Sequence, residues 1–323
     1  MLVAKRIVLV LSALAVFTAA AHAQAQQYPT RPVHVLVGFA AGSGPDVLAR
    51  SVANQLGADL GQNFIVENRP GANATIASNV VAQSAPDGYT LLFTSDSIAP
   101  TPFIYKHLPY DIFKDLTPVA TVGVLDGLLM LVNPSSPAHT VNEFIDYAKK
   151  NRVLYGSPGV GNGLHLAAAL FNKATGLAME HVPFKGASEV GVALLGGNID
   201  VMFVTPPSVM GLIKAGKLRA LAFTGSKPFP ELPDVPLMKD SVPNYPPVQA
   251  WGMFLAPAKT PPELIDKLNT AIRHALLVPA VVNVVQKSGF MPDDRSPAQT
   301  AAFLHAQVED AQKAVAAAGI EPN

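Results

Sequence analysis

The sequence contains no cysteine, and this absence excludes several kinds of site at once. Without thiols the chain has no disulfides, no thiolate metal ligands and no cysteine nucleophile. Its stability must come from an apolar core, and 49% of its residues are hydrophobic. An exported protein without disulfides fits a bacterial periplasm better than a eukaryotic extracellular space.

An excess of charge of either sign is missing as well. The 23 Lys and Arg residues balance the 23 Asp and Glu residues, so the formal net charge is zero. Because nucleic-acid-binding proteins concentrate positive charge in a patch or stripe, we expect no nucleic-acid partner. A length of 323 residues is typical of two domains or one large domain.

Catalytic and nucleotide-binding motifs are absent too. The sequence lacks G-x-x-x-x-G-K-[ST], and the dinucleotide fingerprint that starts at Gly42 fails because Val47 occupies its third glycine position. A serine-hydrolase elbow around Ser157 fails because Tyr155 stands where a glycine is required. The eight histidines form no H-x-x-x-H pair. We therefore expect no catalytic residues, no metal site and no cofactor.

The N-terminus has the pattern of a secretory signal peptide. Lys5 and Arg6 precede an apolar stretch over residues 7–21, and Ala21-His22-Ala23 supplies the small residues of a cleavage site. We predict that residues 1–23 are a signal peptide and that the protein reaches the periplasm. An uncleaved membrane anchor is the alternative, although the stretch is shorter than the roughly 20 residues that span a bilayer.

Strand and helix patterns alternate along the rest of the chain. Apolar residues at Leu48, Val52, Leu56 and Leu60 recur every four positions and predict a helix after Gly44. Further helices are expected at residues 73–83, 141–150, 164–175, 189–195, 262–277, 279–288 and 297–318. Strands are expected at 33–39, 64–67, 89–94, 128–132, 153–156, 181–183, 199–204, 218–224 and 251–255. The segment 228–247 contains seven prolines and is expected to be loop without helix.

This alternation predicts an α/β protein with two lobes. We expect lobe 1 to combine residues 24–125 with 249–323, and lobe 2 to cover 126–248. Crossover strands would join the lobes, with hinges near Asp126 and Gln249 and a cleft between them.

A glycine-rich loop follows the first expected strand. Residues 38–46 read GFAAGSGPD, and Ser43 to Asp46 fit an S-x-x-[DE] helix start with Ser43 as the N-cap. The first turn of a helix leaves N–H groups unpaired and carries partial positive charge, which suits an anion. The alternative is that Ser43 and Asp46 use those N–H groups as ordinary caps.

A second loop of the same kind occurs in the other half of the chain. Residues 155–163 read YGSPGVGNG and again join an expected strand to an expected helix. Two donor-rich helix entrances, one in each lobe, can hold a small carboxylate from both sides without a lysine or arginine. A tight turn without a ligand is the alternative.

The chain as a whole resembles the Bug-type periplasmic solute-binding receptors of tripartite tricarboxylate transporters. The matching stretches include RPVHVLVGFAAGSGPD (31–46), VENRPGANATIAS (66–78), APDGYTLLF (85–93), YGSPGVGNGLHLAAALF (155–171) and LAPAKTPPELIDKLN (255–269). The resemblance implies a periplasmic binding fold of type II, a Venus flytrap that closes around a small carboxylate. It also implies a monomer that delivers its ligand to the membrane subunits of a transporter. A sensor that signals to a membrane partner such as a sensor kinase is an alternative, and a periplasmic hydrolase or isomerase is another.

The resemblance also implies a set of ligand-binding residues. In the family, the two glycine-rich loops hold a carboxylate through backbone groups and water, and neighbouring strand ends line the rest of the pocket. Carried over to this sequence, the set is Phe39, Ala40, Gly42, Ser43, Gly44, Thr94, Ser95, Asp96, Ser157, Gly159, Gly161, Asn162, Phe184, Lys185, Val204 and Thr205.

Three departures from the family pattern suggest a ligand preference. Ser43, with Ala40 and Ala41, replaces the usual prolines and glycines of the first loop. Val204 stands where many members carry aspartate or asparagine, and Phe184 replaces a frequent tyrosine. Ser43 adds a hydroxyl and retains the carboxylate role, whereas the changes at Val204 and Phe184 imply a less polar distal pocket, suited to an aromatic or aliphatic monocarboxylate.

Overall fold

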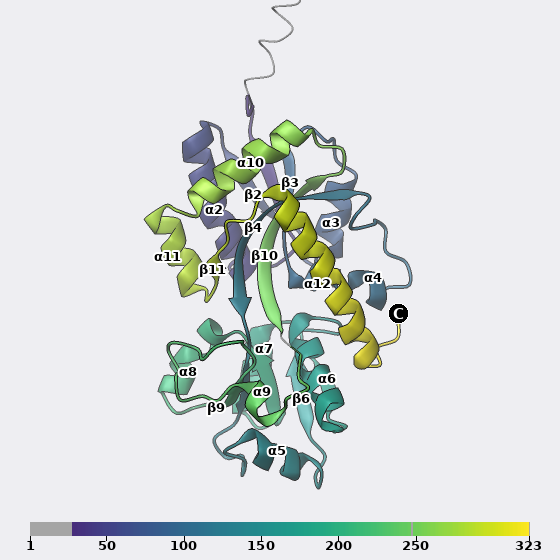
Figure 1. Cartoon of the computed structure of the whole chain (residues 1–323), viewed down its shortest axis with the longest axis vertical. Helices are drawn as coiled ribbons and strands as arrows, with labels where there is room; N and C mark the ends of the chain where they lie inside the picture. The colour runs from purple at the N-terminus through teal and green to yellow at the C-terminus, as the bar shows by residue number, and fades with distance from the viewer. Residues whose placement is uncertain (1–27, 247, 323) are drawn as a thin grey trace, which may run out of the picture.

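The computed structural model describes residues 28–246 and 248–322, so the expected signal peptide lies outside the described residues. Two lobes stand one above the other, each built on its own β-sheet, and two long strands run between them (Figure 1). The predicted α/β class with two lobes is confirmed.

Lobe 1 is built on a sheet of six strands in the order β11-β4-β10-β3-β1-β2. The strands are β1 (Val33–Val37), β2 (Phe64–Asn68), β3 (Thr90–Ser95), β4 (Leu116–Asp126), β10 (Gln249–Pro257) and β11 (Met291–Pro292). Strand β1 pairs in parallel with β2 and β3, whereas β10 runs antiparallel to β3 and β4.

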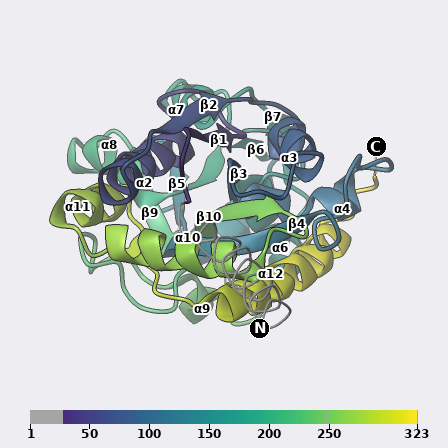
Figure 2. The same ribbon diagram turned by 90° about the horizontal axis from the view of Figure 1, so that it is seen from above.

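Helices cover both faces of this sheet. One face packs against α2 (Gly44–Leu60), α10 (Pro262–Ala275) and α11 (Pro279–Lys287), and the other against α3 (Thr75–Ala82) and α12 (Pro297–Ala317). The turn η2 (Ala72–Ala74) precedes α3, and η3 (Asp96–Ile98) and α4 (Thr101–Ile104) follow β3. Seen from above, α2 and α11 lie on one side of the molecule and α3 and α4 on the opposite side (Figure 2).

Lobe 2 is smaller and also consists of one sheet with helices on both faces. Its sheet has the order β7-β6-β8-β5-β9, with β5 (Leu129–Val132), β6 (Leu154–Ser157), β7 (Glu180–Pro183), β8 (Val201–Val204) and β9 (Arg219–Phe223). Helices α5 (Val141–Ala148), α6 (Gly163–Thr175) and α9 (Met238–Ser241) pack on one face, and α7 (Ala187–Leu195) and α8 (Met210–Lys214) on the other. A short turn, η4 (Pro206–Ser208), follows β8.

Strands β4 and β10 form one antiparallel ribbon that reaches from lobe 1 to lobe 2. Their pairing extends from Leu116 opposite Pro257 to Asp126 opposite Gln249, with two register shifts on the way. The sequence patterns do not predict β4, because Pro118 and Gly123 are residue types that weaken strands. One register shift lies between Phe254 and Leu255, where Pro118 faces Leu255, so an irregularity accommodates the proline.

Two further expectations were wrong. The helix expected from residue 73 begins at Thr75, because Ala72, Asn73 and Ala74 adopt positive φ angles of 47°, 52° and 67°. The proline-dense segment, expected to lack helix, contains the single turn α9.

Among the described residues no single helix is both long and apolar enough to cross a membrane. The bent pair of α10 and α11, with 81° between its members, meets that criterion by length and composition.

Candidate functional site

The glycine-rich loop of lobe 2 touches lobe 1 beside the end of β3. Asn73 Nδ2 of lobe 1 donates a hydrogen bond to the carbonyl oxygen of Val160 at 3.3 Å. A Cβ atom on Gly163, the first residue of α6, would lie 2.3 Å from Oδ2 of Asp96, just after β3. Because β1 and β3 are parallel neighbours, their carboxyl ends share this edge of the lobe 1 sheet.

The loop between β1 and α2 is anchored by Asp46, which is only 2% exposed. Its carboxylate accepts hydrogen bonds from the Gly42 N–H at 2.8 Å, from Arg50 Nε at 3.0 Å and from Asn68 Nδ2 at 2.7 Å. Burial acts to raise the pKa of Asp46, but these hydrogen bonds outweigh it and hold the pKa below its ordinary value. The Gly42 N–H, a predicted ligand donor, is therefore already used.

Ser43 occupies the predicted N-cap position but does not cap the helix. Its backbone is extended, with φ −70° and ψ 161°, and its side chain makes no capping hydrogen bond. The hydroxyl oxygen is buried and has no partner within the described residues, and the same is true of Thr94 Oγ1. An unsatisfied buried hydroxyl costs about 1–3 kcal/mol, and the hydroxyls of Thr75, Tyr110 and Thr121 are in the same state.

The loop between β6 and α6 is tied together by its own polar groups. Ser157 Oγ donates to the Gly159 carbonyl oxygen at 3.0 Å and accepts from the Gly159 N–H at 3.3 Å. The Gly161 N–H donates to Nδ1 of His165 at 2.9 Å, and Asn162 Oδ1 accepts from the Leu164 N–H at 2.9 Å. The N–H groups of Gly159 and Gly161, which were candidates for ligand binding, are thus engaged within the loop.

The backbone donors that are left over differ from the predicted set. In lobe 1 the N–H groups of Ala40 and Gly44 donate no hydrogen bond to any described residue, and in lobe 2 the same holds for Val160 and Gly163. Val160 and Gly163 were not predicted, because sequence alone does not show which amides of a glycine-rich loop are used internally.

A stack of aromatic rings lies next to the loop between β6 and α6. The imidazoles of His165 and His181 are 3.9 Å apart and nearly parallel, and the ring of Tyr155 stacks on His181 at 5.0 Å. Burial lowers the pKa of His165 to about 3, with a smaller effect from His181, and burial lowers the pKa of His181 to about 4. Both rings are therefore neutral near pH 7. His165 carries its proton on Nε2, because Nδ1 accepts from Gly161.

The pair formed by Ser157 and His181 has the distance of a catalytic dyad, with 2.6 Å between Oγ and Nε2. Its environment does not support nucleophilic catalysis. Ser157 is 0% exposed, and its hydroxyl already donates to Gly159. Within the described residues His181 has no carboxylate partner, and a pKa of about 4 makes it a poor base at neutral pH. The hydrogen bond between Ser157 and His181 instead stabilises the loop between β6 and α6.

The predicted apolar residues of the pocket are largely part of the cores. Val204 is 4% exposed and belongs to an apolar cluster of lobe 2, against which Phe184 also packs. Phe39 packs against a core cluster of lobe 1. The inference of a less polar pocket from Val204 and Phe184 stays a prediction.

The remaining predicted residues form short-range polar contacts. Ser95 Oγ accepts from the Ser97 N–H at 3.3 Å, and Thr205 Oγ1 lies 3.4 Å from Ser208 Oγ. Lys185 is exposed, and its N–H donates to the Glu189 carboxylate at 3.1 Å. These contacts leave the predicted role of all three residues open to test.

Two residues at the lobe boundary were missed by sequence reasoning. Asn73 reaches both Val160 and the hydroxyl of Tyr105, each at 3.3 Å. Ile104 fills the space beside Gly161, where a Cβ atom would lie 2.3 Å from its Cδ1. Neither residue carried a signal in the sequence, because Asn73 lay at the start of an expected helix and its left-handed conformation is seen only in the structure.

No group of three or more His, Asp or Glu side chains in the described part of the chain has the geometry of a metal site. Two mixed sheets joined by a β ribbon, with glycine-rich helix entrances on both lobes, define the class of two-lobed solute-binding proteins. The chain belongs to the tripartite tricarboxylate transporter receptor family TctC, a family of periplasmic receptors, whose model matches residues 48–320.

Individual relatives agree with this assignment. The protein BugT of Bordetella pertussis is 35% identical over 296 residues, covering 90% of both chains. A UPF0065 protein of Bordetella bronchiseptica is 34% identical over 301 residues, covering 93% of this chain and 89% of its own. The resemblance to Bug-type receptors is therefore confirmed.

Solved structures share the whole fold. Rpa4515 of R. palustris with adipate is 31% identical with a TM-score of 0.83, covering 92% of this chain and 100% of its own. The periplasmic binding protein BugD is 30% identical with a TM-score of 0.81, covering 92% and 100%. MatC of Rhodopseudomonas palustris with bound malate is 29% identical with a TM-score of 0.78, covering 89% and 100%.

Proposed function

We propose that this protein captures a small carboxylate between its lobes and delivers it to the membrane subunits of a tripartite tricarboxylate transporter. The ligand's carboxylate would lie between the loop at residues 39–44 and the loop at 157–163. The remaining predicted residues, from Thr94 to Asp96, at Phe184 and Lys185, and at Val204 and Thr205, would border the rest of the site.

The observation that carries this proposal is the set of groups at the helix entrance of each lobe that have no hydrogen-bond partner among the described residues. Ser43 Oγ is buried without a partner, and the N–H groups of Gly44 and Gly163 at the first residues of α2 and α6 donate to no described residue. Such groups favour an anion. The adipate and malate bound by relatives of the same fold are small carboxylates, which supports the proposal.

The test is a ligand screen by thermal shift and calorimetry. Adipate, malate and benzoate are titrated, with adipamide as the uncharged match for adipate. We expect at least one carboxylate to raise the melting temperature and adipamide to leave it unchanged. Benzoate or a monocarboxylate of similar size should bind more tightly than malate if the distal pocket is less polar. A screen without a carboxylate hit would contradict the proposal.

Two variants localise the site. Ser43→Ala should weaken carboxylate binding about fivefold, since one hydrogen bond contributes about 1 kcal/mol, and Gly44→Leu should abolish it by blocking the helix entrance. Ser51→Ala on the same helix is the matched control and should bind as the wild type does. Equal affinity for Ser43→Ala and wild type would place the ligand elsewhere.

The partner and the compartment are part of the same proposal. We expect a monomer that is exported to the periplasm after cleavage following Ala23, with lobe boundaries at residues 125/126 and 248/249. Delivery to a permease and signalling to a sensor kinase use the same pocket. Cross-linking the ligand-bound receptor to membrane proteins before purification distinguishes delivery from signalling. Co-purified transporter subunits would support delivery, and a co-purified kinase would favour the sensor.

A further inference from the structure

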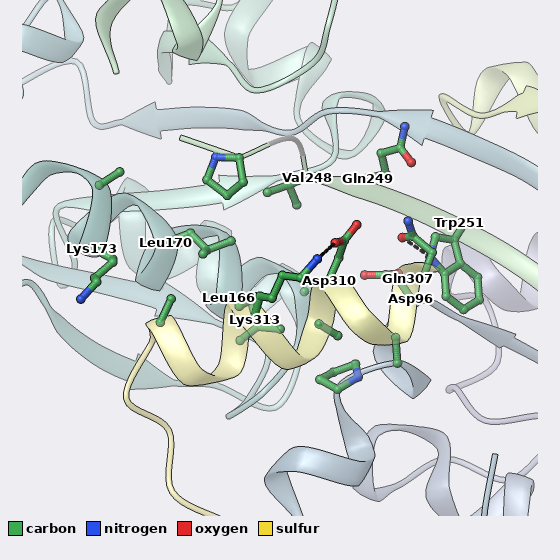
Figure 3. Close-up of a pocket in the computed structure, with 18 of the residues that line it drawn as sticks. Asp96, Leu166, Leu170, Lys173, Val248, Gln249, Trp251, Gln307, Asp310 and Lys313 are labelled. Atoms are coloured by element: carbon green, nitrogen blue, oxygen red, sulfur yellow. Dashed lines mark hydrogen bonds and ion pairs between the residues drawn. The ribbon is translucent and has the colours of Figure 1, made fainter. Parts of the chain in front are cut away.

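A cavity of about 620 Å³ lies between the lobes, beside α12. Its walls are formed by Leu166 and Leu170 of α6, by Ala311 and Ala314 of α12 and by Trp251 of β10. Figure 3 shows α12 along one side and the β10 residues Gln249 and Trp251 at one end. Two residues of the proposed carboxylate site, Asp96 and Gly163, also line this cavity.

Asp96 is the distinctive polar group of the cavity. It is partly buried at the end next to Trp251 and forms no ion pair with any described residue. Burial raises the pKa of Asp96 to about 6, against the effect of hydrogen bonds from Ser95 and from the backbone of Trp251. At pH 7.5 the carboxylate is therefore ionised, although no cation accompanies it, which is an unfavourable state for a buried charge.

The other charged groups of the cavity do not neutralise Asp96. Lys313 lies on the rim and is paired with Asp310 at 3.1 Å. Lys173 lies at the opposite end of the cavity from Asp96, with its ammonium directed away from it (Figure 3). Asp96 therefore has no cationic side chain beside it, and its Oδ2 faces Gly163 at the N-terminus of α6, which contributes only partial positive charge.

The neutral polar groups at the same end complete the site. Gln307 Oε1 accepts a hydrogen bond from Trp251 Nε1 at 2.9 Å, and Gln249 lies beside them. The amide oxygen of Gln249 is an additional acceptor for an N–H donor. The remaining wall is aliphatic, so it favours an apolar body over water.

We infer that this cavity is a second binding site, which takes a small organic cation with a short apolar body, such as a primary alkylammonium ion. The ammonium group lies at the Asp96 carboxylate and the alkyl chain lies along Leu166, Leu170 and Ala314. This site shares Asp96 and Gly163 with the proposed carboxylate site but takes a ligand of opposite charge, and its test needs no carboxylate ligand.

The single tryptophan of the chain provides a local readout, since Trp251 lines this cavity. The protein, without any added carboxylate ligand, is titrated at pH 7.5 with n-butylammonium chloride while Trp251 fluorescence is followed. n-Butanol is the matched neutral probe. We expect saturable binding of butylammonium, with at least tenfold weaker binding of butanol.

Variants separate a specific site from general attraction. Asp96→Asn should weaken butylammonium binding at least tenfold, whereas Asp146→Asn, an exposed carboxylate on α5, should leave it unchanged. Leu170→Trp should fill the aliphatic part and block binding while Asp96 is retained; with two tryptophans present, this variant is measured by calorimetry. Butanol binding as tightly as butylammonium, or unchanged affinity in Asp96→Asn, would overturn the inference.

Discussion

Two aspartates at the candidate site show how neighbouring groups determine the protonation of a carboxylate. Asp46 is almost fully buried but accepts hydrogen bonds from Arg50, Asn68 and Gly42, and its pKa is held low. Asp96 is also shielded from water but has no cationic neighbour, and its pKa is raised to about 6. The first carboxylate stabilises a loop, whereas the second is held in an unfavourable charged state at neutral pH.

The raised pKa of Asp96 predicts a pH-dependent effect on stability. The folded state favours the protonated form of Asp96, so its contribution to stability is fully present below the unfolded pKa, near 4. As the pH rises through the folded pKa of about 6, the free energy of unfolding decreases. Asp96→Asn should therefore stabilise the protein by about 1–3 kcal/mol at pH 7.5 and give little gain at pH 4. Urea unfolding of both proteins at the two pH values measures this. Lys173, Asp310 and Lys313, the other charged groups of the cavity, are the same in both proteins. A gain of equal size at pH 4 would contradict the assignment.

The stacked histidines predict the opposite pH dependence. Their pKa values are lowered to about 3 and about 4, so the unfolded chain takes up protons below pH 6.5 that the folded protein does not, and stability is lost as the pH falls. Between pH 7.5 and 5.0 the pair should cost about 2–4 kcal/mol. In the double variant His165→Asn and His181→Gln, which retains an acceptor for Gly161 and a donor for Ser157, this loss should be smaller by that amount. His139→Gln, at an exposed position in lobe 2, is the control, and its pH dependence should match the wild type.

At the scale of elements, the turn η2 combines strain with contact between the lobes. Three consecutive residues, Ala72 to Ala74, have positive φ although none is glycine. Ala74 packs against Gly38 so closely that a Cβ atom there would lie 2.2 Å from the Ala74 Cβ. The turn thus supports the first glycine-rich loop and presents Asn73 to the second one. Strain of this kind costs on the order of 1 kcal/mol per residue and is typical of functional sites.

A substitution that relieves the backbone strain at Ala72 tests directly whether that strain lowers stability. Ala72 is exposed, and Ala72→Gly should raise the free energy of unfolding by about 0.5–1 kcal/mol, because glycine adopts positive φ without a steric penalty. Ala85→Gly, at another exposed position outside the set of positive φ angles, should lower stability instead. Chemical denaturation compares the two variants, and a loss of stability in both would argue against strain at Ala72.

The elements that local patterns specify were predictable, and those that depend on distant partners were not. The strand at β1, the helix α2 and the loop between them follow from apolar spacing and glycine placement. The hydroxyl of Ser43 was expected to cap the helix, yet it makes no capping hydrogen bond and has no partner among the described residues. The use of the Gly161 N–H by His165 depends on the stacked histidines, which meet only in the folded sheet. Asp96 was predicted as a site residue, but its cavity is created by α12, more than 200 positions later in the chain.

At the scale of the whole molecule, the end of α12 joins the two lobes. Ala314 and Val315 form one apolar cluster with Leu166 of lobe 2 and Ile104 of lobe 1. This contact lies beside the cavity at Asp96, whose walls also come from both lobes. Any change in the angle between the lobes must therefore alter this contact and the shape of the cavity together.

A charge placed in this cluster should separate the lobes. Ala314 is 9% exposed, and Ala314→Glu buries an unpaired carboxylate, which should destabilise the protein by about 2 kcal/mol or more. X-ray scattering should show a larger radius of gyration than in the wild type. Ala316→Glu, exposed on the same helix, should change neither quantity. An unchanged radius in Ala314→Glu would mean that the β ribbon alone fixes the lobe angle.

The place of β10 in the lobe 1 sheet has a consequence for synthesis of the chain. This strand lies between β3 and β4, but it is made only after the whole of the lobe 2 sheet has left the ribosome. Lobe 2 can complete its core while the emerging lobe 1 still lacks its central strand and the helices α10 to α12. Because protein domains fold as units during synthesis, the N-terminal part of lobe 1 must wait for the last quarter of the polypeptide. A nascent chain that stops before residue 249 therefore holds one finished lobe and one open sheet.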